Sequence, residues 1–151
     1  MYIFDGAMGT MLQSAGLEEG YCPELFNVER PEVVKNIHAQ YLQHGSDVIT
    51  TNTFGACGLK LEDYDLQDRV KEINIAAVKV AKEAIAEFKP SARGAGSMGP
   101  TGRFLQPLGN MSFDSIYDTY REQAEALIEG GVDFIIIETI IDVQEMRAAL
   151  L

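Results

Sequence analysis

Two carboxylates, Asp5 and Glu138, follow short apolar runs near the two ends of a 151-residue chain. Asp5 follows YIF (residues 2–4), and Glu138 follows DFIII (residues 133–137). Carboxylates seldom lie in such apolar surroundings unless a partner or a function explains them. A pair of carboxylates at one site could hold a metal ion, transfer protons or bind an ammonium group.

Polar or glycine-rich segments continue from these apolar runs. Asp5 opens DGAMGT, in which Gly6 and Ala7 would let backbone amides approach an anion such as a carboxylate. The run that ends at Thr50 continues into Thr51, Asn52 and Thr53. A plainer interpretation also stands, since Asp5 could cap the turn that follows it and the threonines could be ordinary strand residues.

The hydrophobic pattern predicts alternating strands and helices. Apolarity in the strand candidates is continuous, which is typical of strands buried on both faces. The predicted strands are Tyr2–Phe4, Asp47–Thr51, Ala92–Ser97 and Asp133–Glu138. Apolar residues at helical spacing predict helices at Pro31–His44, Leu66–Phe88 and Ser112–Glu129, with a last helix from Asp142 or Val143.

This order of elements predicts a parallel sheet with right-handed crossovers. GSDVI (residues 45–49) is also echoed by GVDFI (residues 131–135), which favours repeated units and a barrel. A closed (β/α)₈ barrel takes about 250 residues. The sequence therefore predicts one α/β domain over residues 1–151, the N-terminal half of a TIM barrel with about four βα units, truncated in the fourth helix. An open four-stranded α/β layer is the alternative.

Ligands of parallel α/β folds bind at the carboxyl ends of the strands. Every predicted strand ends there in polar or glycine-rich residues, whereas the loops at the opposite ends are short and plain. We therefore expect the binding residues at this edge. They are Asp5, Gly6, Ala7, Thr51, Asn52, Thr53 and Glu138.

Composition narrows the class of protein. The formal net charge of −11 argues against a nucleic-acid partner, because phosphate binding needs clustered Lys and Arg. No apolar run approaches the roughly 20 residues of a membrane helix, and the N-terminus lacks signal-peptide features. Without either feature we expect a cytoplasmic protein. Cys22 and Cys57 form no CxxC pair, so we expect no metal site.

Four motifs in order carry a resemblance to a known family. DGAMGTML, GSDVITTNTFGA, GSMGPTG and DFIIIETIID resemble the homocysteine S-methyltransferase domain, most closely the N-terminal domain of cobalamin-dependent methionine synthases. The resemblance covers essentially the whole chain. It implies a (β/α)₈ barrel and a transferase of methionine biosynthesis, a methyltransferase that moves a methyl group onto the homocysteine sulfur.

The resemblance also implies roles for the candidate residues. Asp5 and Glu138 would bind the amino group of homocysteine. Gly6 and Ala7 amides, with the Thr51–Thr53 turn, would hold its carboxylate and line the pocket. The complete enzyme would use two cofactors, a zinc ion bound by three cysteine thiolates and a cobalamin. The chain has no Cys-Cys pair, so we expect no cofactor in it and an isolated chain that is inactive.

Partners and alternatives follow from a half-barrel with open strand edges. We expect homocysteine as ligand, and either the remaining half of the barrel or self-association through the open edges. One alternative function is a non-catalytic half-barrel that pairs with itself. Another is a metal-dependent α/β enzyme built on the carboxylates.

Overall fold

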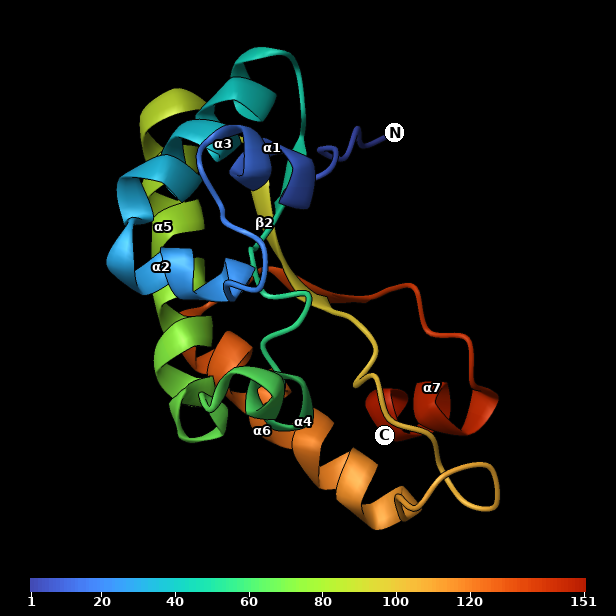
Figure 1. Ribbon diagram of the computed structural model, residues 1–151. Helices are drawn as coiled ribbons and strands as arrows, with labels where there is room; N and C mark the ends of the chain where they lie inside the picture. Colours follow the sequence, from blue (N-terminus) through green and yellow to red (C-terminus); the bar gives the residue numbers. More distant parts are fainter.

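A computed structural model describes residues 1–151 and contains a three-stranded parallel sheet (Figure 1). The strands are β1 (Val48–Thr50), β2 (Arg93–Met98) and β3 (Phe134–Ile137). β2 lies in the centre and pairs in parallel with both neighbours. The predicted α/β class with parallel strands is confirmed.

Seven α-helices connect and flank the strands. They are α1 (Gly9–Ser14), α2 (Phe26–Glu29), α3 (Pro31–Gln43), α4 (Gly58–Leu61), α5 (Val70–Phe88), α6 (Phe113–Gly130) and α7 (Val143–Leu150). Short 3₁₀ turns lie at Pro23–Leu25, Glu62–Tyr64 and Gln67–Arg69. The four longest helices agree with prediction within a few residues, whereas α1, α2, α4 and the 3₁₀ turns were not predicted. Ser112 and Asp142 cap α6 and α7, accepting hydrogen bonds from the backbone N–H groups of Ser115 and Gln144.

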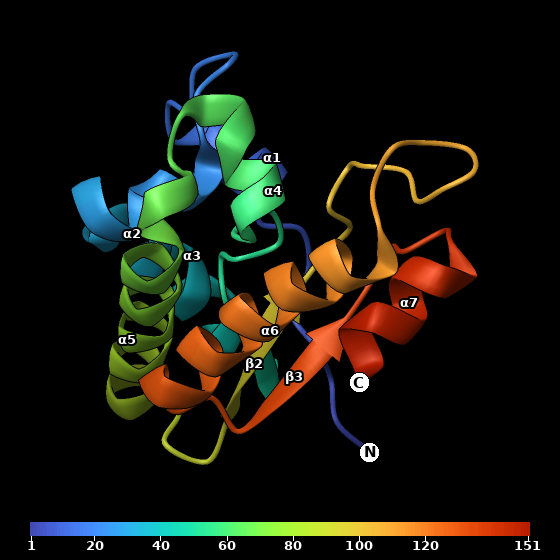
Figure 2. The same ribbon diagram turned by 90° about the horizontal axis from the view of Figure 1, so that it is seen from below.

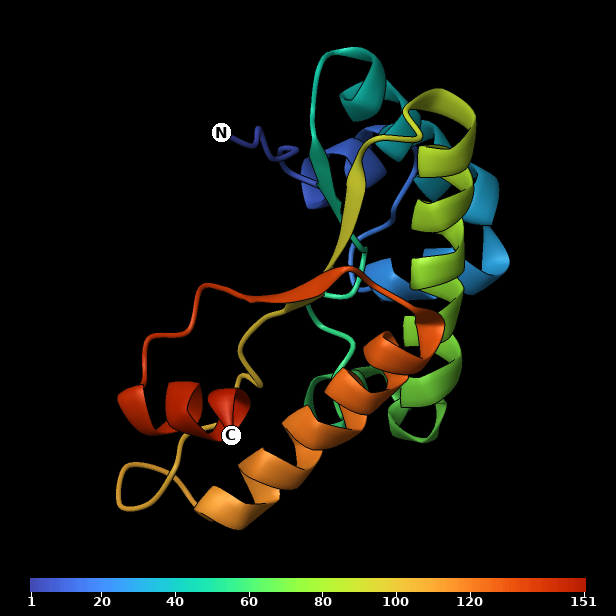
Figure 3. The same cartoon turned by 180° about the vertical axis from the view of Figure 1, so that it is seen from behind.

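The longer helices α3, α5 and α6 pack beside the sheet (Figures 1 and 3). Glycine in β2 permits the close approach of α5 and α6. A Cβ at Gly94 would touch Ile85 of α5, and one at Gly96 would lie 3.0 Å from Leu127 of α6. The small residues of this strand are therefore those that let two helices approach it.

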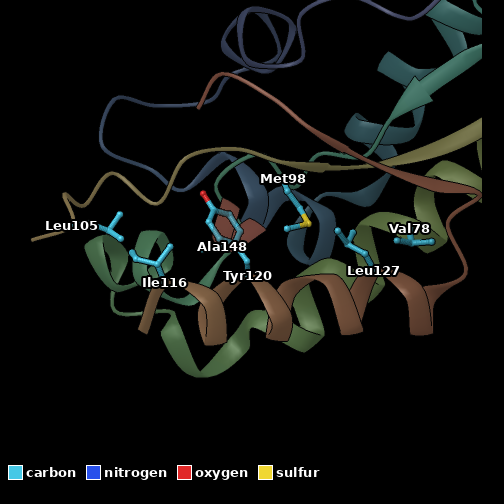
Figure 4. Packing of buried hydrophobic residues seen from close by; sticks show 7 residues of the cluster. All are labelled: Val78, Met98, Leu105, Ile116, Tyr120, Leu127 and Ala148. Carbon is cyan, nitrogen blue, oxygen red and sulfur yellow. The ribbon is translucent and has the colours of Figure 1, made fainter. Parts of the chain in front are cut away.

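The largest core cluster lies between α6 and the sheet (Figure 4). Ile116, Tyr120 and Leu127 extend from α6, and Met98 of β2 points toward them. Ala148 of α7 belongs to the same cluster. This packing joins the end of β2 to both C-terminal helices.

At β3 the second face of the sheet is open to solvent, which corrects the expectation that residues 134–137 are buried on both faces. Ile135 packs toward the α6 cluster, but Phe134 is 38% exposed and its ring meets Phe4, itself 43% exposed, at a centroid distance of 6.3 Å. Figure 2 shows β3 at one edge of the sheet. Continuous apolarity identified the strand, but no element of the chain covers its second face.

The predicted first strand, Tyr2–Phe4, is reduced to one parallel bridge between Phe4 and Val48. The Ile3 carbonyl accepts from the Asp47 and Val48 amides, and the Asp5 amide donates to the Val48 carbonyl at 3.0 Å. The segment thus lies beside β1 in the predicted direction. It has a neighbour on one side only, and Tyr2 and Ile3 stay exposed, so pairing does not extend.

None of the helices combines the length and the apolar character that a membrane span requires.

Gly99, just after β2, provides a test of how closely the chain packs against the turn after β1. A Cβ there would lie 2.7 Å from the Phe54 carbonyl oxygen, to which the Gly99 amide donates. Because that atom is backbone, Gly99→Ala should lower the free energy of unfolding by about 1–3 kcal/mol in urea titrations. Gly9→Ala is the control, since nothing lies within 4 Å of its Cβ. Equal stability of the two variants would contradict the close approach.

Candidate functional site

A cavity of about 510 Å³ lies at the carboxyl ends of the strands. Its walls come from Phe4 and the segment after it, the 3₁₀ turn at Pro23–Leu25, the turn after β1, and the ends of β2 and β3. Six of the seven predicted residues line it, namely Asp5, Gly6, Ala7, Thr51, Asn52 and Glu138. The structure thus brings together residues from both ends of the chain.

Asp5 is held by the end of β1. One carboxylate oxygen accepts from the Thr50 amide at 2.8 Å, and the other accepts from the Thr50 hydroxyl at 3.1 Å. Burial nevertheless raises the pKa of Asp5 to about 6, with a smaller upward contribution from the charge of Glu138. The two carboxylates therefore interact, and a cation near them would favour ionised Asp5.

Glu138 is held by the end of β2. Its Oε1 accepts a hydrogen bond of 2.6 Å from the Ser97 hydroxyl, and its amide donates to the Met98 carbonyl at 3.0 Å. The next residue, Thr139, has a φ of +64°, which is rare for a β-branched side chain. Such backbone conformations concentrate at functional sites. Glu138 therefore lies at the cavity and not within the core.

The turn after Asp5 presents unused backbone donors. The amides of Gly6 and Ala7 donate to no protein acceptor. The Tyr41 hydroxyl donates to the Ala7 carbonyl at 2.8 Å, and a Cβ at Gly6 would lie 3.1 Å from the same hydroxyl. Glycine therefore lets the turn lie against Tyr41 while two N–H groups remain available for an anion.

Thr53 does not reach the cavity. It is fully buried, its hydroxyl lies 2.6 Å from that of Thr51, and it donates to the Ser97 carbonyl at 2.7 Å. Thr51 lines the cavity but is only 3% exposed. The two hydroxyls thus bind the protein itself, although neither threonine is a strand residue, because β1 ends at Thr50.

Sequence reasoning missed Glu24 as a cavity residue. It is 5% exposed, and its oxygens accept from the Gly55 amide at 2.7 Å and the Cys22 thiol at 3.3 Å. The available signal was an isolated glutamate in CPELFNV, the same kind of apolar setting that drew attention to Glu138. Ser97, the partner of Glu138, was also missed as a site residue.

The cavity is acidic without a basic counterpart. Asp5, Glu24 and Glu138 line it, and none of its fifteen lining residues is Lys, Arg or His. Carboxylates in a partly desolvated cavity without a neighbouring cation attract a positively charged ligand. An ammonium group with a nearby carboxylate would match both the acidic side and the free amides.

The residues present do not fit a thiolate metal site. The chain has no group of three or more His, Cys, Asp or Glu side chains that could hold a metal ion. Its cysteines are buried, and burial raises the pKa of Cys22 to about 12 and that of Cys57 to about 11. Both therefore stay thiols at neutral pH, whereas metal ligation uses thiolates.

Comparison with known sequences agrees with the motif resemblance. A sequence model described as "Homocysteine S-methyltransferase" matches residues 2–151. Methionine synthases of Mycobacterium tuberculosis and Mycobacterium leprae are 39% and 36% identical over 157 aligned residues. The chain spans only 13% of the length of each, although 97% of it is aligned.

Comparison with solved structures identifies the architecture. The oxidised and metallated forms of the homocysteine methyltransferase MmuM from Escherichia coli match with TM-scores of 0.81, at 25% and 26% identity. These matches cover 98% and 97% of this chain but 56% and 57% of MmuM. The predicted partial barrel is confirmed, with the chain corresponding to about half of this relative.

The raised pKa of Asp5 predicts a pH-dependent stability. A carboxyl that titrates near 3.8 when unfolded and near 6 when folded favours the native state at low pH, and this contribution is lost as pH rises through about 6. Asp5→Asn keeps an acceptor for the Thr50 amide but does not ionise. Urea titrations between pH 4 and pH 8 should show Asp5→Asn gaining stability relative to the parent as pH rises. A stability difference between the two proteins that does not change with pH would contradict the raised pKa of Asp5.

Proposed function

Because the chain belongs to the homocysteine S-methyltransferase family, we propose that residues 1–151 form the part of a homocysteine-binding barrel that recognises the amino-acid end of the substrate. The observation that carries the proposal is the meeting of Asp5 and Glu138 in one cavity without a basic side chain. An α-amino acid carries an ammonium group that these carboxylates can accept. Methyl transfer to its sulfur would be the reaction of the complete barrel.

The two charged ends of the amino acid would bind different segments. Asp5 and Glu138 would accept hydrogen bonds from the ammonium group. The free amides of Gly6 and Ala7 would donate to the carboxylate, and Asn52 would line the pocket beside them. Thr51 and Thr53 contribute through the protein hydrogen bonds of the turn.

The chain's own residues bind and orient the substrate but do not activate it. A zinc ion would supply a homocysteine thiolate in the complete enzyme, but no residues here form a thiolate site for it. Those ligands, and any site for cobalamin, would have to come from polypeptide other than residues 1–151. We therefore propose that the isolated chain binds homocysteine without methylating it, in the cytoplasm as the sequence suggested.

The exposed apolar face of the sheet at β3 favours contact with another protein segment. Phe4 and Phe134 are partly exposed on it, and β3 has a free edge. We propose that barrel residues corresponding to the rest of the MmuM chain cover this face, since this chain spans 56% of that relative. Without them, the same face would associate with a second copy.

Two other functions compete with amino-acid binding, and the first of them involves no substrate. A self-associating half-barrel would use the open face alone and would have no need of the carboxylate pair. A metal-dependent enzyme would need more ligands than Asp5 and Glu138 provide, because no cluster of three is formed. The cavity favours amino-acid recognition over both.

Calorimetric titration with L-homocysteine tests the binding proposal. Glu138→Gln removes one charged acceptor while preserving size, so its Kd should rise about 10- to 100-fold. Glu19→Gln, an exposed carboxylate outside the cavity, should leave binding unchanged. The analogue 4-sulfanylbutanoate, which lacks the amino group, should bind weakly to both parent and Glu138→Gln. Equal homocysteine affinity of parent and Glu138→Gln would remove Glu138 from the site.

Sedimentation velocity tests the open face. The isolated chain should associate as its concentration rises, and Phe134→Ser should shift it toward monomer. Phe88→Ser is a matched control, because Phe88 is 37% exposed at the end of α5 and lies away from this face. A chain that stays monomeric at high concentration and does not bind a hydrophobic dye would contradict an uncovered apolar face.

A further inference from the structure

Ser97 lies between the cavity and a buried network of hydroxyl and amide groups. It is 2% exposed at the end of β2, yet it lines the cavity. Its hydroxyl donates to Oε1 of Glu138 at 2.6 Å. Oε2 of Glu138 accepts no protein hydrogen bond, so this one contact determines how the carboxylate is held.

The backbone of Ser97 is itself fixed by the turn after β1. Its amide donates to the Thr51 hydroxyl at 3.2 Å, and its carbonyl accepts from the Thr53 hydroxyl at 2.7 Å. The two threonine hydroxyls are 2.6 Å apart. Two threonines predicted to bind substrate therefore hold the serine that holds Glu138.

Helices α5 and α6 anchor this turn in place. The side-chain amide of Gln123, on α6, donates to the Thr53 carbonyl at 2.8 Å. Asn74, on α5, donates to the Ala56 carbonyl at 2.9 Å. Both side chains are fully buried, so the turn cannot shift without leaving polar groups unpaired in the core.

Two of the three carboxylates that line the cavity, those of Asp5 and Glu138, are supported in the same way. Thr50 donates to Asp5, and Ser97 donates to Glu138. In each case a hydroxyl at the end of a neighbouring strand makes the contact. A neutral donor orients a carboxylate without cancelling the charge that would attract an ammonium group.

We propose that Ser97 is a positioning residue for Glu138, which it holds in one orientation with Oε2 left for the ammonium group of the ligand. The proposal rests on the proposed function of the cavity. Without the hydroxyl, the Glu138 side chain can sample other rotamers, and ordering it costs part of the binding free energy. The loss should fall on ligands that carry the amino group.

The first experiment compares two ligands in calorimetry. Ser97→Ala should raise the Kd for L-homocysteine about 2- to 10-fold relative to that for 4-sulfanylbutanoate. In a Glu138→Gln background, Ser97→Ala should add no further loss of this preference. Ser112→Ala is the control, because it removes the cap of α6 and lowers stability without touching the cavity. An unchanged ligand preference in Ser97→Ala, or independent losses in the double variant, would overturn the proposal.

A second measurement does not depend on homocysteine binding. With ¹³C-labelled glutamate, the carboxyl resonance of Glu138 is identified by its loss in Glu138→Gln. It should shift in Ser97→Ala and stay in place in Ser112→Ala. A resonance that does not move in Ser97→Ala would refute the positioning role. A shifted resonance in a protein that fails to prefer homocysteine would instead refute the proposed function of the cavity.

Discussion

The parallel pairing of β2 with both neighbours is the constraint on which the site depends. Parallel strands share one edge for their carboxyl ends, so Asp5 and Glu138 meet although 133 positions separate them in the sequence. The register places Met98 opposite Ile137, and the Glu138 amide then continues the ladder to the Met98 carbonyl. A β3 strand running the other way would carry Glu138 to the opposite edge of the sheet. The glycines of β2 belong to the same constraint, since they let α5 and α6 pack against the central strand.

The charge of the cavity follows from the kind of donor that supports it. Thr50 and Ser97 stabilise the carboxylates through hydrogen bonds but supply no positive charge. For Asp5 these bonds do not outweigh burial, because its pKa is still raised to about 6. The repulsion between the two acids is relieved by a cation placed between them. An arginine in either supporting position would stabilise the protein against this repulsion and would remove the reason for a cationic ligand to bind.

The long elements and six of the fifteen residues that line the cavity were predictable from the sequence, because both depend on local pattern and one general rule. Helical periodicity located α3, α5, α6 and α7, and the strand-end rule selected six residues that line the cavity. The predictions that failed depend on contacts between segments that are distant in the sequence. Whether Phe134 is covered depends on which chain lies on the second face, and whether Thr53 faces the cavity depends on the carbonyl of Ser97. Glu24 reaches the cavity through short 3₁₀ and α-helical turns that have no periodic signal.

The division between recognition and activation has an energetic consequence. The groups proposed to recognise an amino acid come from the strand ends of this chain, whereas the thiolates that would activate its sulfur are not among them. The cavity also adjoins an uncovered face, on which Phe4 and Phe134 remain in contact with water. Two unit charges 4 Å apart attract by about 1 kcal/mol in bulk water and by about 4 kcal/mol at the effective dielectric of a protein surface. Covering this face would therefore strengthen the hold of Asp5 and Glu138 on an ammonium group without any new contact to it. Closure of a barrel around this half would thus improve substrate binding in the same step that brings other residues to the sulfur.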